Sequence, residues 1–199
     1  MPVVGPRGAD FPPGAPRPEG RDYTPRLIDR DRREVVIDFV LHGDGPAAGW
    51  AATARPGDTV GMGGPRASFV VRGDFDWYLL AGDETALPAI GRRIEELPAG
   101  ARVIAYIEIA DPAERQSFAT PAALDLHWVE RSARGTLLNA VRTADLPAGA
   151  GYTFIAGEAA TSAALRDFLV SARGVDPAFI KAAGYWRDGD ADFYDGHEH

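Results

Sequence analysis

Glycine and proline interrupt this chain throughout its length, with 23 glycines and 16 prolines among 199 residues. Both residue types end or bend regular structure, so this frequency favours many short elements joined by turns over a helical bundle. Residues 1–20 alone hold six prolines and four glycines without any periodicity. We therefore expect an irregular arm or loop at the start of the chain.

The segment that follows has the character of antiparallel β-structure. Residues 34–42 are rich in β-branched side chains and have the length of a strand. Residues 47–54, which include Trp50, are expected to form a short helix after a turn. Two further strands are predicted at residues 59–62 and 68–72. This pattern is typical of a small β-barrel.

Beyond residue 76 the pattern changes to strands alternating with helices. Apolar runs predict strands at residues 77–81, 103–109, 124–129 and 152–156. Helical spacing predicts helices at residues 85–97, with Ala86, Ile90 and Ile94 on one face, and 158–172, with Leu165, Phe168 and Leu169 on one side. This alternation predicts a parallel sheet covered on both faces. We therefore expect an antiparallel β domain at residues 1–73 and an α/β domain at residues 74–199.

Composition excludes several classes of function. The net charge of −8 offers no concentration of positive charge for nucleic acid. The chain has no cysteine, which excludes disulfides, thiolate-held metals and cysteine nucleophiles. No apolar run approaches the ~18 residues of a membrane helix and no secretory signal is visible, so we expect a cytoplasmic protein without a membrane partner. The sequence nominates no acid–base pair, no catalytic residue and no metal ligand.

In an α/β sheet, ligands bind where strands end and helices begin. Two loops fit this description, at residues 81–85 and 156–158, with Thr85 placed to cap a helix. Their acidic residues Asp83, Glu84 and Glu158 would repel a phosphate, and are better suited to accept hydrogen bonds from hydroxyls or an amide. The alternative is that both loops are ordinary strand-to-helix turns.

A second candidate site lies at residues 21–26 and 42–51. Arg21 is a forked cation suited to a diphosphate, and Tyr23 offers a flat face beside the small polar Thr24. In an extended segment, Arg21 and Tyr23 would share one face, as an aromatic ring system linked to a pyrophosphate requires. The alternative is a surface strand with a solvated arginine and a packed tyrosine.

Five motifs occur in order between Arg21 and Gly189: R-x-Y-T-x-R, H-G-x-G-P-A-x-x-W-A, L-L-A-G-D-E-T-A-L-P-A-I, A-G-E-A and G-Y-W-R. Together they resemble the siderophore-interacting protein family, which comprises flavin-dependent ferric-siderophore reductases of the ferredoxin–NADP reductase superfamily. The resemblance implies a flavin-binding β-barrel followed by a nucleotide-binding α/β domain. It also implies FAD and either NADPH or NADH as cofactors.

The resemblance assigns site residues by position. The residues that would hold FAD are Arg21, Tyr23, Thr24, His42, Gly45, Pro46 and Ala47. Those that would frame the nicotinamide nucleotide are Gly82, Asp83, Glu84, Thr85, Ala86, Gly157 and Glu158. Arg131 and Arg134 are candidates for a 2′-phosphate, and Tyr185 and Trp186 would lie near the flavin or close the core.

The implied reaction passes electrons from NAD(P)H through FAD to siderophore-bound Fe(III), releasing the iron. The candidate cations for an anionic ferric siderophore are Arg26, Arg66, Lys181 and Arg187. Members of the family carry barrel strands before R-x-Y-T-x-R that this chain lacks, so we expect a partial barrel, which a second copy of the chain would complete. The alternatives are a truncated, non-catalytic binding scaffold and a flavin reductase with another acceptor.

Overall fold

The structure is a computed structural model, and it describes residues 3–5, 8–10, 20–41, 45–64, 71, 73–131, 136–190 and 193. The chain forms two compact units, and it passes from one to the other three times. One unit comprises Met1–Tyr23 and Leu41–Gly73, and the other comprises Thr24–Val40 and Asp74–His199. The division into domains at residues 1–73 and 74–199 stays a prediction.

The larger unit is built on a five-stranded parallel sheet in the order β7-β6-β5-β8-β9. Its strands are β5 (Trp77–Asp83), β6 (Arg102–Ile109), β7 (Ala123–Glu130), β8 (Gly151–Glu158) and β9 (Ile180–Trp186). The inner strands β5 and β8 are buried along nearly their whole length, because both of their faces are covered. This confirms the predicted parallel sheet.

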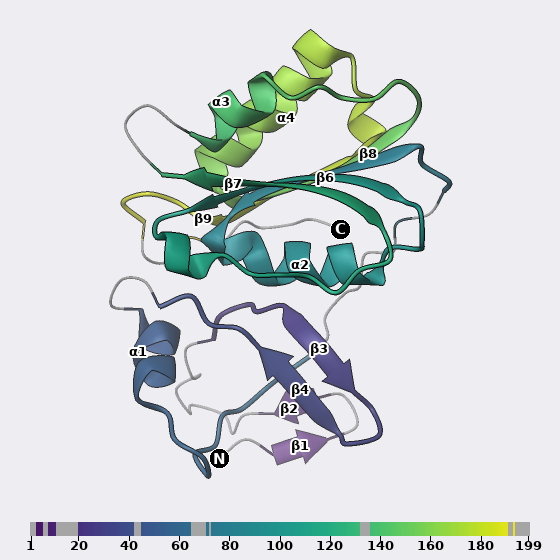
Figure 1. Ribbon diagram of the computed structural model, residues 1–199. Coiled ribbons are helices and arrows are strands. Elements are labelled where there is room, and N and C mark those ends of the chain that lie inside the picture. The colour runs from purple at the N-terminus through teal and green to yellow at the C-terminus, as the bar shows by residue number, and fades with distance from the viewer. Residues whose placement is uncertain are drawn as a thin grey trace. The chain divides into compact units, whose positions relative to one another are not determined.

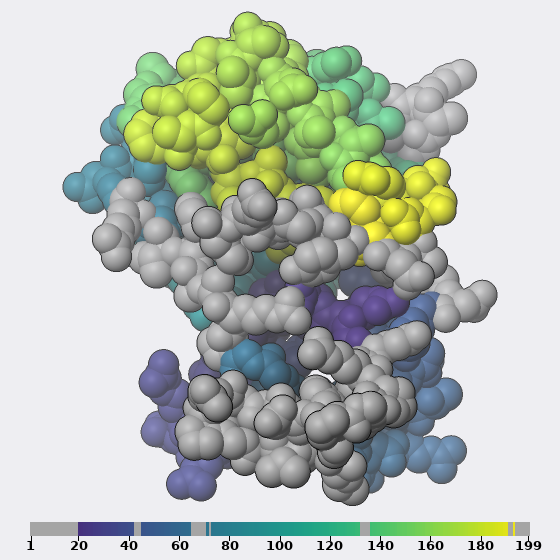
Figure 2. Space-filling model, turned by 180° about the vertical axis from the view of Figure 1, so that it is seen from behind, coloured from purple at the N-terminus to yellow at the C-terminus, as the bar shows by residue number. Residues whose placement is uncertain are grey.

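Helices cover both faces of this sheet (Figure 1). The helices are α2 (Leu87–Glu96), α3 (Leu137–Arg142) and α4 (Ala159–Arg173), and the short 3-10 turns are η1 (Glu84–Ala86), η2 (Pro112–Glu114) and η3 (Pro177–Phe179). Helix α2 lies on one face and α3 and α4 lie on the other (Figure 1). The outer surface of α4, light green in Figure 2, carries exposed charged residues such as Arg166 and Asp167.

The core follows the predicted helical faces. Ala86, Ile90 and Ile94 are completely buried, as are Leu165 and Leu169. The cluster beneath α3 and α4 also contains the inward-facing side chains of three strands, namely Trp77, Leu79, Ala81, Ile104 and Ile155. Each of the four predicted strands and both predicted helices of this unit is present, with ends displaced by one or two residues.

Strand β9 was not predicted from the sequence. Its residues Ile180–Trp186 contain two alanines and a glycine, so they form no apolar run. Its composition does not favour a strand by itself, but its backbone forms hydrogen bonds with β8 in a parallel pair, and this pairing makes it a strand.

An antiparallel hairpin of β3 (Pro25–Asp29) and β4 (Glu34–Ile37) belongs to the same unit. A bidentate ion pair joins it to α2, in which Nη1 and Nη2 of Arg26 donate to the two carboxylate oxygens of Glu95 at 2.7 and 2.8 Å. Arg92 of α2 also donates a hydrogen bond to the carbonyl oxygen of Pro25. The strand predicted at residues 34–42 is therefore real but ends at Ile37.

The smaller unit differs more from the expectation. Residues 1–20 are not wholly irregular, because β1 (Val3–Gly5) and β2 (Gly8–Asp10) form a short antiparallel pair. The predicted helix is present as α1 (Pro46–Thr53). Residues 59–62 form no strand, and residues 68–72 lie outside the described part of the chain except for Val71, which is in no strand. The structure thus has a parallel sheet and small antiparallel pairs.

Candidate functional site

The carboxyl ends of the parallel strands surround a cavity of about 400 Å³ in the larger unit. Its lining comes from the ends of β5, β6, β8 and β9 and from the beginnings of α3 and α4: Asp83, Glu108, Arg131, Leu137, Ala156, Glu158, Ala160, Thr161, Ser162, Trp186 and Asp188. A cavity at this edge of an open parallel sheet is the usual ligand position for such a fold. Four of the predicted site residues therefore line one cavity, namely Asp83, Arg131, Glu158 and Trp186.

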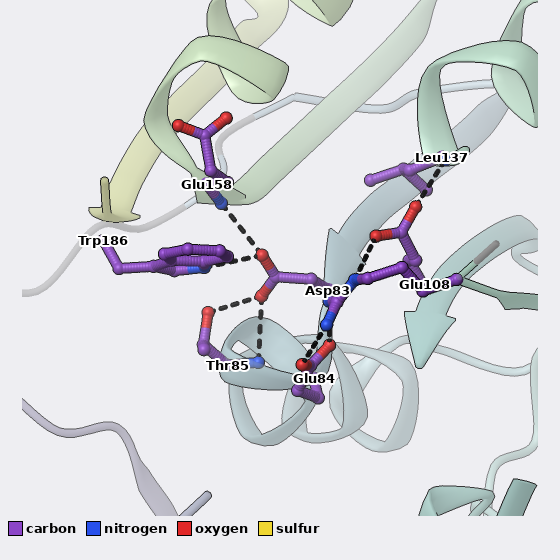
Figure 3. A network of polar contacts seen from close by, with 8 residues as sticks. Asp83, Glu84, Thr85, Glu108, Leu137, Glu158 and Trp186 are labelled. Atoms are coloured by element: carbon purple, nitrogen blue, oxygen red, sulfur yellow. Dashed lines mark hydrogen bonds and ion pairs between the residues drawn. The ribbon is translucent and has the colours of Figure 1, made fainter. Parts of the chain in front are cut away.

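Asp83 is the centre of a hydrogen-bond network at this edge (Figure 3). Its Oδ1 accepts from the backbone N–H and the hydroxyl of Thr85, and its Oδ2 accepts from the Glu158 N–H and Trp186 Nε1–H. Burial raises the pKa of the Asp83 carboxyl, against the lowering effect of the hydrogen bonds that it accepts. The capping residue of this turn is therefore Asp83, which corrects the prediction that Thr85 caps the helix.

The glycines of the two loops leave room for protein atoms. A Cβ at Gly82 would lie 2.5 Å from the carbonyl oxygen of Ala156 and 2.7 Å from Ala86 Cβ. A Cβ at Gly157, where φ is +140°, would lie 2.5 Å from Asp83 Oδ2. The close packing of β5 against β8, η1 and the Asp83 carboxylate thus requires glycine at both positions.

Glu84 and Glu108 hold the guanidinium of Arg131 from two sides. Nη1 and Nη2 of Arg131 donate to the two carboxylate oxygens of Glu84, and Nε donates to Glu108 Oε1 at 2.9 Å. The hydrogen bond to Glu84 is the main reason that the pKa of Arg131 is raised. The other oxygen of Glu108 accepts from the N–H of Leu137, the first residue of α3 (Figure 3).

The carboxylate of Glu158 caps α4. It accepts a hydrogen bond from the Thr161 N–H at 2.7 Å. Burial acts to raise the pKa of Glu158, but the N–H groups of Ala160 and Thr161 outweigh it and lower the pKa. Because carboxylates occupy the turn after β5 and the start of α4, a phosphate does not fit at either place. Carboxylate and backbone oxygens do suit the hydroxyl and amide donors of a nucleoside.

The first residues of α1 in the smaller unit carry no carboxylate, unlike the turn after β5 and the start of α4. Gly45 is the capping residue and makes no side-chain hydrogen bond to the helix, and Pro46 occupies the first turn. No acidic residue lies in that turn, and among the described residues no atom lies within 4 Å of a Cβ added at Gly45. Helix N–H groups without a side-chain cap fit a diphosphate. Arg21 and Tyr23, in the same unit, are exposed.

Thr24 lies beside the end of β9, since its side chain shares a hydrogen bond with that of Tyr185. Burial raises the pKa of Tyr185. The structure thus brings together two motifs that are 161 positions apart in the sequence, R-x-Y-T-x-R and G-Y-W-R. Ala86, by contrast, is completely buried in the core and is not among the residues that line the cavity described above.

Most of the basic residues predicted to bind an anionic substrate already interact with other residues of the protein. Arg26 is bound to Glu95 and also lies 3.9 Å from Asp38. Arg187 lies over the ring of Phe193, at 4.5 Å. Lys181 lies on β9 and has a partner of its own.

Three of the candidate residues are outside the described part of the chain: His42, Arg66 and Arg134. Within the residues that the structure describes, no three His, Cys, Asp or Glu side chains are grouped as a metal site would require. In that same part of the chain, no helix combines the length and the apolar character needed to cross a bilayer.

Two features of the site were missed by reasoning from the sequence. Glu108, which binds both Arg131 and the start of α3, could have been noticed as an acidic residue inside an apolar strand. Trp186 was expected near the flavin or the core, but its hydrogen bond to Asp83 had no signal in the sequence.

Comparison with known proteins places both parts of the chain in one family. Residues 75–189 match the family model described as "Siderophore-interacting protein", and residues 1–69 match "Siderophore-interacting FAD-binding domain". The chain belongs to the siderophore-interacting protein family.

Three relatives illustrate the similarity. The NADPH-dependent ferric-chelate reductase of Escherichia coli (strain K12) is 36% identical over 189 residues, which cover 93% of this chain and 72% of the relative. The ferric vibriobactin reductase of Vibrio cholerae is 32% identical over 179 residues, covering 87% and 66%. The crystal structure of a siderophore utilization protein from T. fusca superimposes with a TM-score of 0.84 at 40% identity, covering 97% of this chain and 75% of that protein.

Proposed function

We propose that this chain is an oxidoreductase that passes electrons from NAD(P)H through FAD to the Fe(III) of a ferric siderophore, and so releases the iron. The observation that carries the proposal is the similarity, over 93% of the chain, to a ferric-chelate reductase whose cofactor is NADPH. The match of residues 1–69 to a siderophore-interacting FAD-binding domain supports FAD as the second cofactor. The domain division at residues 73 and 74 and the cytoplasmic location belong to the same proposal.

Arg21, Tyr23, Pro46 and Ala47, which are proposed for FAD, belong to the smaller unit. Arg21 and the backbone N–H groups of α1 from Ala47 onward would bind the diphosphate, and Tyr23 would pack against the ring system. Pro46 has no N–H, and its role would be to fix the start of the helix. The chemistry that FAD would supply when bound is the division of a two-electron donor's electrons into single transfers. Reduction of Fe(III) to Fe(II) takes one electron, and hard oxygen ligands hold Fe(II) less well than Fe(III).

The residues proposed for the nicotinamide nucleotide surround the cavity of the larger unit. The carboxylate oxygens of Asp83 and Glu158 already accept hydrogen bonds from groups of the protein. We therefore propose that these residues shape the cavity more than they bind the ligand. The side chain of Arg131 is 39% exposed, and the residue lines the cavity. It remains our candidate for a 2′-phosphate, although two carboxylates already offset its charge.

The partial flavin barrel and its completion by a second copy are also proposals. The supporting observation is the hairpin of β3 and β4, whose apolar side chains are exposed by 40–56%: Leu27, Ile28, Val35 and Val36. An isolated two-stranded hairpin has unpaired edges and little stability of its own. Size-exclusion chromatography with light scattering, at several protein concentrations, tests this proposal. A monomer that binds FAD would contradict it.

The central test is the visible spectrum of the purified chain before and after addition of FAD and removal of the excess. Bound flavin absorbance, followed by formation of Fe(II) from a ferric siderophore with NADPH or NADH, is the expected result. A chain that cannot take up FAD would refute the reductase proposal. A flavin-loaded chain that reduces free flavins or quinones but no ferric chelate would indicate a different acceptor.

A further inference from the structure

The chain passes from the smaller to the larger unit between Tyr23 and Thr24, inside the R-x-Y-T-x-R motif. The residues directly after this crossing are held by two different elements of the larger unit. The side chain of Thr24 shares a hydrogen bond with that of Tyr185, at the end of β9. The carbonyl oxygen of Pro25 accepts a hydrogen bond of 2.9 Å from Arg92 of α2. The second half of the motif is therefore fastened to the larger unit at consecutive residues.

Arg26, the last residue of the motif, adds the contact with the most favourable geometry. Its two bonds to Glu95 are parallel and charge-assisted, and the two side chains are only 15% and 28% exposed. The guanidinium passes over α2 at Gly91, where an added Cβ would lie 3.4 Å from Arg26 Nε. Glu95 is held in its turn, because it also accepts a hydrogen bond from the N–H of Ala119. The arginine is thus bound by a carboxylate that is itself fixed.

The two arginines of the motif have different surroundings. Both terminal nitrogens of Arg26 donate to Glu95, and its Nε lies 3.9 Å from Asp38, so its charge is offset within the protein. This arrangement suits the predicted contact with an anionic substrate poorly. Arg21, five residues earlier, is exposed, as the proposed contact with a diphosphate requires.

We propose that the ion pair of Arg26 and Glu95 is an anchor that positions the flavin segment, residues 21–24, for FAD. This inference rests on the proposed function, and it makes Arg26 a positioning residue that binds the protein and not the cofactor. A segment that is held in place before FAD arrives loses less conformational freedom on binding. If the backbone of one further residue had to be ordered at that moment, FAD affinity would fall about 5- to 30-fold.

The test measures the FAD affinity of the purified 199-residue chain at pH 7, by titration followed through the fluorescence of FAD. We expect Arg26→Met to weaken FAD binding about tenfold. Arg26→Lys keeps the charge but not the two-pronged guanidinium, and should weaken FAD binding about threefold. The matched control is Arg32→Met, which removes an exposed ion pair with Glu34 from the turn of the same hairpin. Its FAD affinity should stay within about twofold of the wild type.

Substitution of Glu95 distinguishes an anchor from a direct contact between Arg26 and FAD. If Arg26 bound FAD itself, removal of Glu95 would release the guanidinium and would not weaken FAD binding. The anchor predicts instead that Glu95→Met weakens FAD binding about tenfold, and that Arg26→Met/Glu95→Met binds FAD no more weakly than either single variant. Wild-type affinity in Glu95→Met, or additive losses in the double variant, would overturn the inference.

The same variants separate positioning from a purely structural role. Circular dichroism establishes that each variant is folded under the conditions of the titration, and urea unfolding measures its stability. A pair that only stabilises the fold would lower the urea midpoint of Arg26→Met and leave the FAD affinity of the folded variant unchanged, which would overturn the inference. If the methionine variants do not fold, Arg26→Lys and Glu95→Gln decide the question, and wild-type FAD affinity in both would overturn it.

Failure of the proposed function gives a different result. A wild-type chain that binds no FAD would overturn the proposed function together with this inference. A wild-type chain that binds FAD, with unchanged affinity in Arg26→Met, would overturn the inference alone.

Discussion

Replacement of Arg131 by methionine separates a structural from a ligand-binding role for this side chain. Methionine keeps most of the length and apolar volume of the arginine stem and removes the guanidinium. The variant loses three charge-assisted hydrogen bonds, two to Glu84 and one to Glu108. It also leaves two carboxylates without a cation, and their side chains are only 12% and 14% exposed.

The structure sets the expected size of the effect. Removal of one partner from a buried ion pair costs about 3–5 kcal/mol, because the other charge stays buried. Arg131 itself is 39% exposed, so solvent screens part of the interaction. We therefore expect Arg131→Met to lower the free energy of unfolding by about 2–4 kcal/mol. This loss should occur without any cofactor.

The matched control is Arg115→Met. Arg115 forms an ion pair with Glu130 at 2.7 Å, a length between those of the two Arg131 pairs, but both side chains are about half exposed. Exposed pairs contribute about 0–1 kcal/mol. Equilibrium urea unfolding of the ligand-free proteins at pH 7, followed by circular dichroism, compares the two. With a urea dependence of about 2 kcal/mol per molar, the midpoint should fall by about 1–2 M in Arg131→Met and by less than about 0.5 M in the control.

A second substitution identifies the cause. The double variant Glu84→Gln/Arg131→Met lacks one of the two carboxylates that Arg131→Met leaves without a cation. Its loss of unfolding free energy should therefore be smaller than the sum of the losses in the two single variants by about 1–2 kcal/mol. The reasoning is refuted if Arg131→Met costs no more than Arg115→Met. Arg131 would then be free for a phosphate, and the ion pairs would not stabilise the fold.

Two further predictions concern the fold around the site. Gly157→Ala should cost about 2–4 kcal/mol of unfolding free energy, because its Cβ would meet the Asp83 carboxylate at a positive φ. Gly174→Ala, also at positive φ but with open space, should cost only about 1 kcal/mol in the same urea assay, and equal losses would contradict the steric argument. The hydrogen bond from Arg26 lowers the pKa of Glu95 below the ordinary glutamate value of 4.5. This interaction therefore stabilises the folded protein fully above pH 4.5, and the stabilisation is lost as the pH falls through the lowered pKa. Glu95→Gln should therefore be about 1 kcal/mol less stable than the wild type at pH 7 and equally stable in acid, and a difference that persists at low pH would contradict this reasoning.

The α/β unit could be predicted from the sequence because its signals are local. Ile90 and Ile94 repeat at helical spacing, and residues 103–109 form an apolar run, so the sequence of each segment indicates whether it is a helix or a strand. Gly82 and Gly157 end two of the predicted apolar runs, and Pro88 lies in the first turn of α2, so these residues mark two of the turns. Strand β9 and the end of β4 depend on pairing partners instead, and they were missed or placed too long.

The site was predicted in part for the same reason. The motifs around Gly82–Ala86 and Gly157–Glu158 are contiguous, and their place at the ends of two strands follows from the chain itself. Which groups the acidic side chains bind could not be predicted, since the partners come from distant segments. Asp83 binds Trp186 across 103 positions, and Arg131 binds Glu84 across 47.

The sequence by itself determined the family, the alternation of strands and helices, and four of the residues that line the cavity, namely Asp83, Arg131, Glu158 and Trp186. All of these reside in local patterns of apolar spacing, turn residues and motifs. Only the tertiary structure decided that Asp83 and Glu158 cap the protein's own turns, that Glu108 and Glu84 share Arg131, and that Trp186 faces the cavity. These arrangements depend on the order of strands in the sheet, which sets the distant segments that meet at its carboxyl edge.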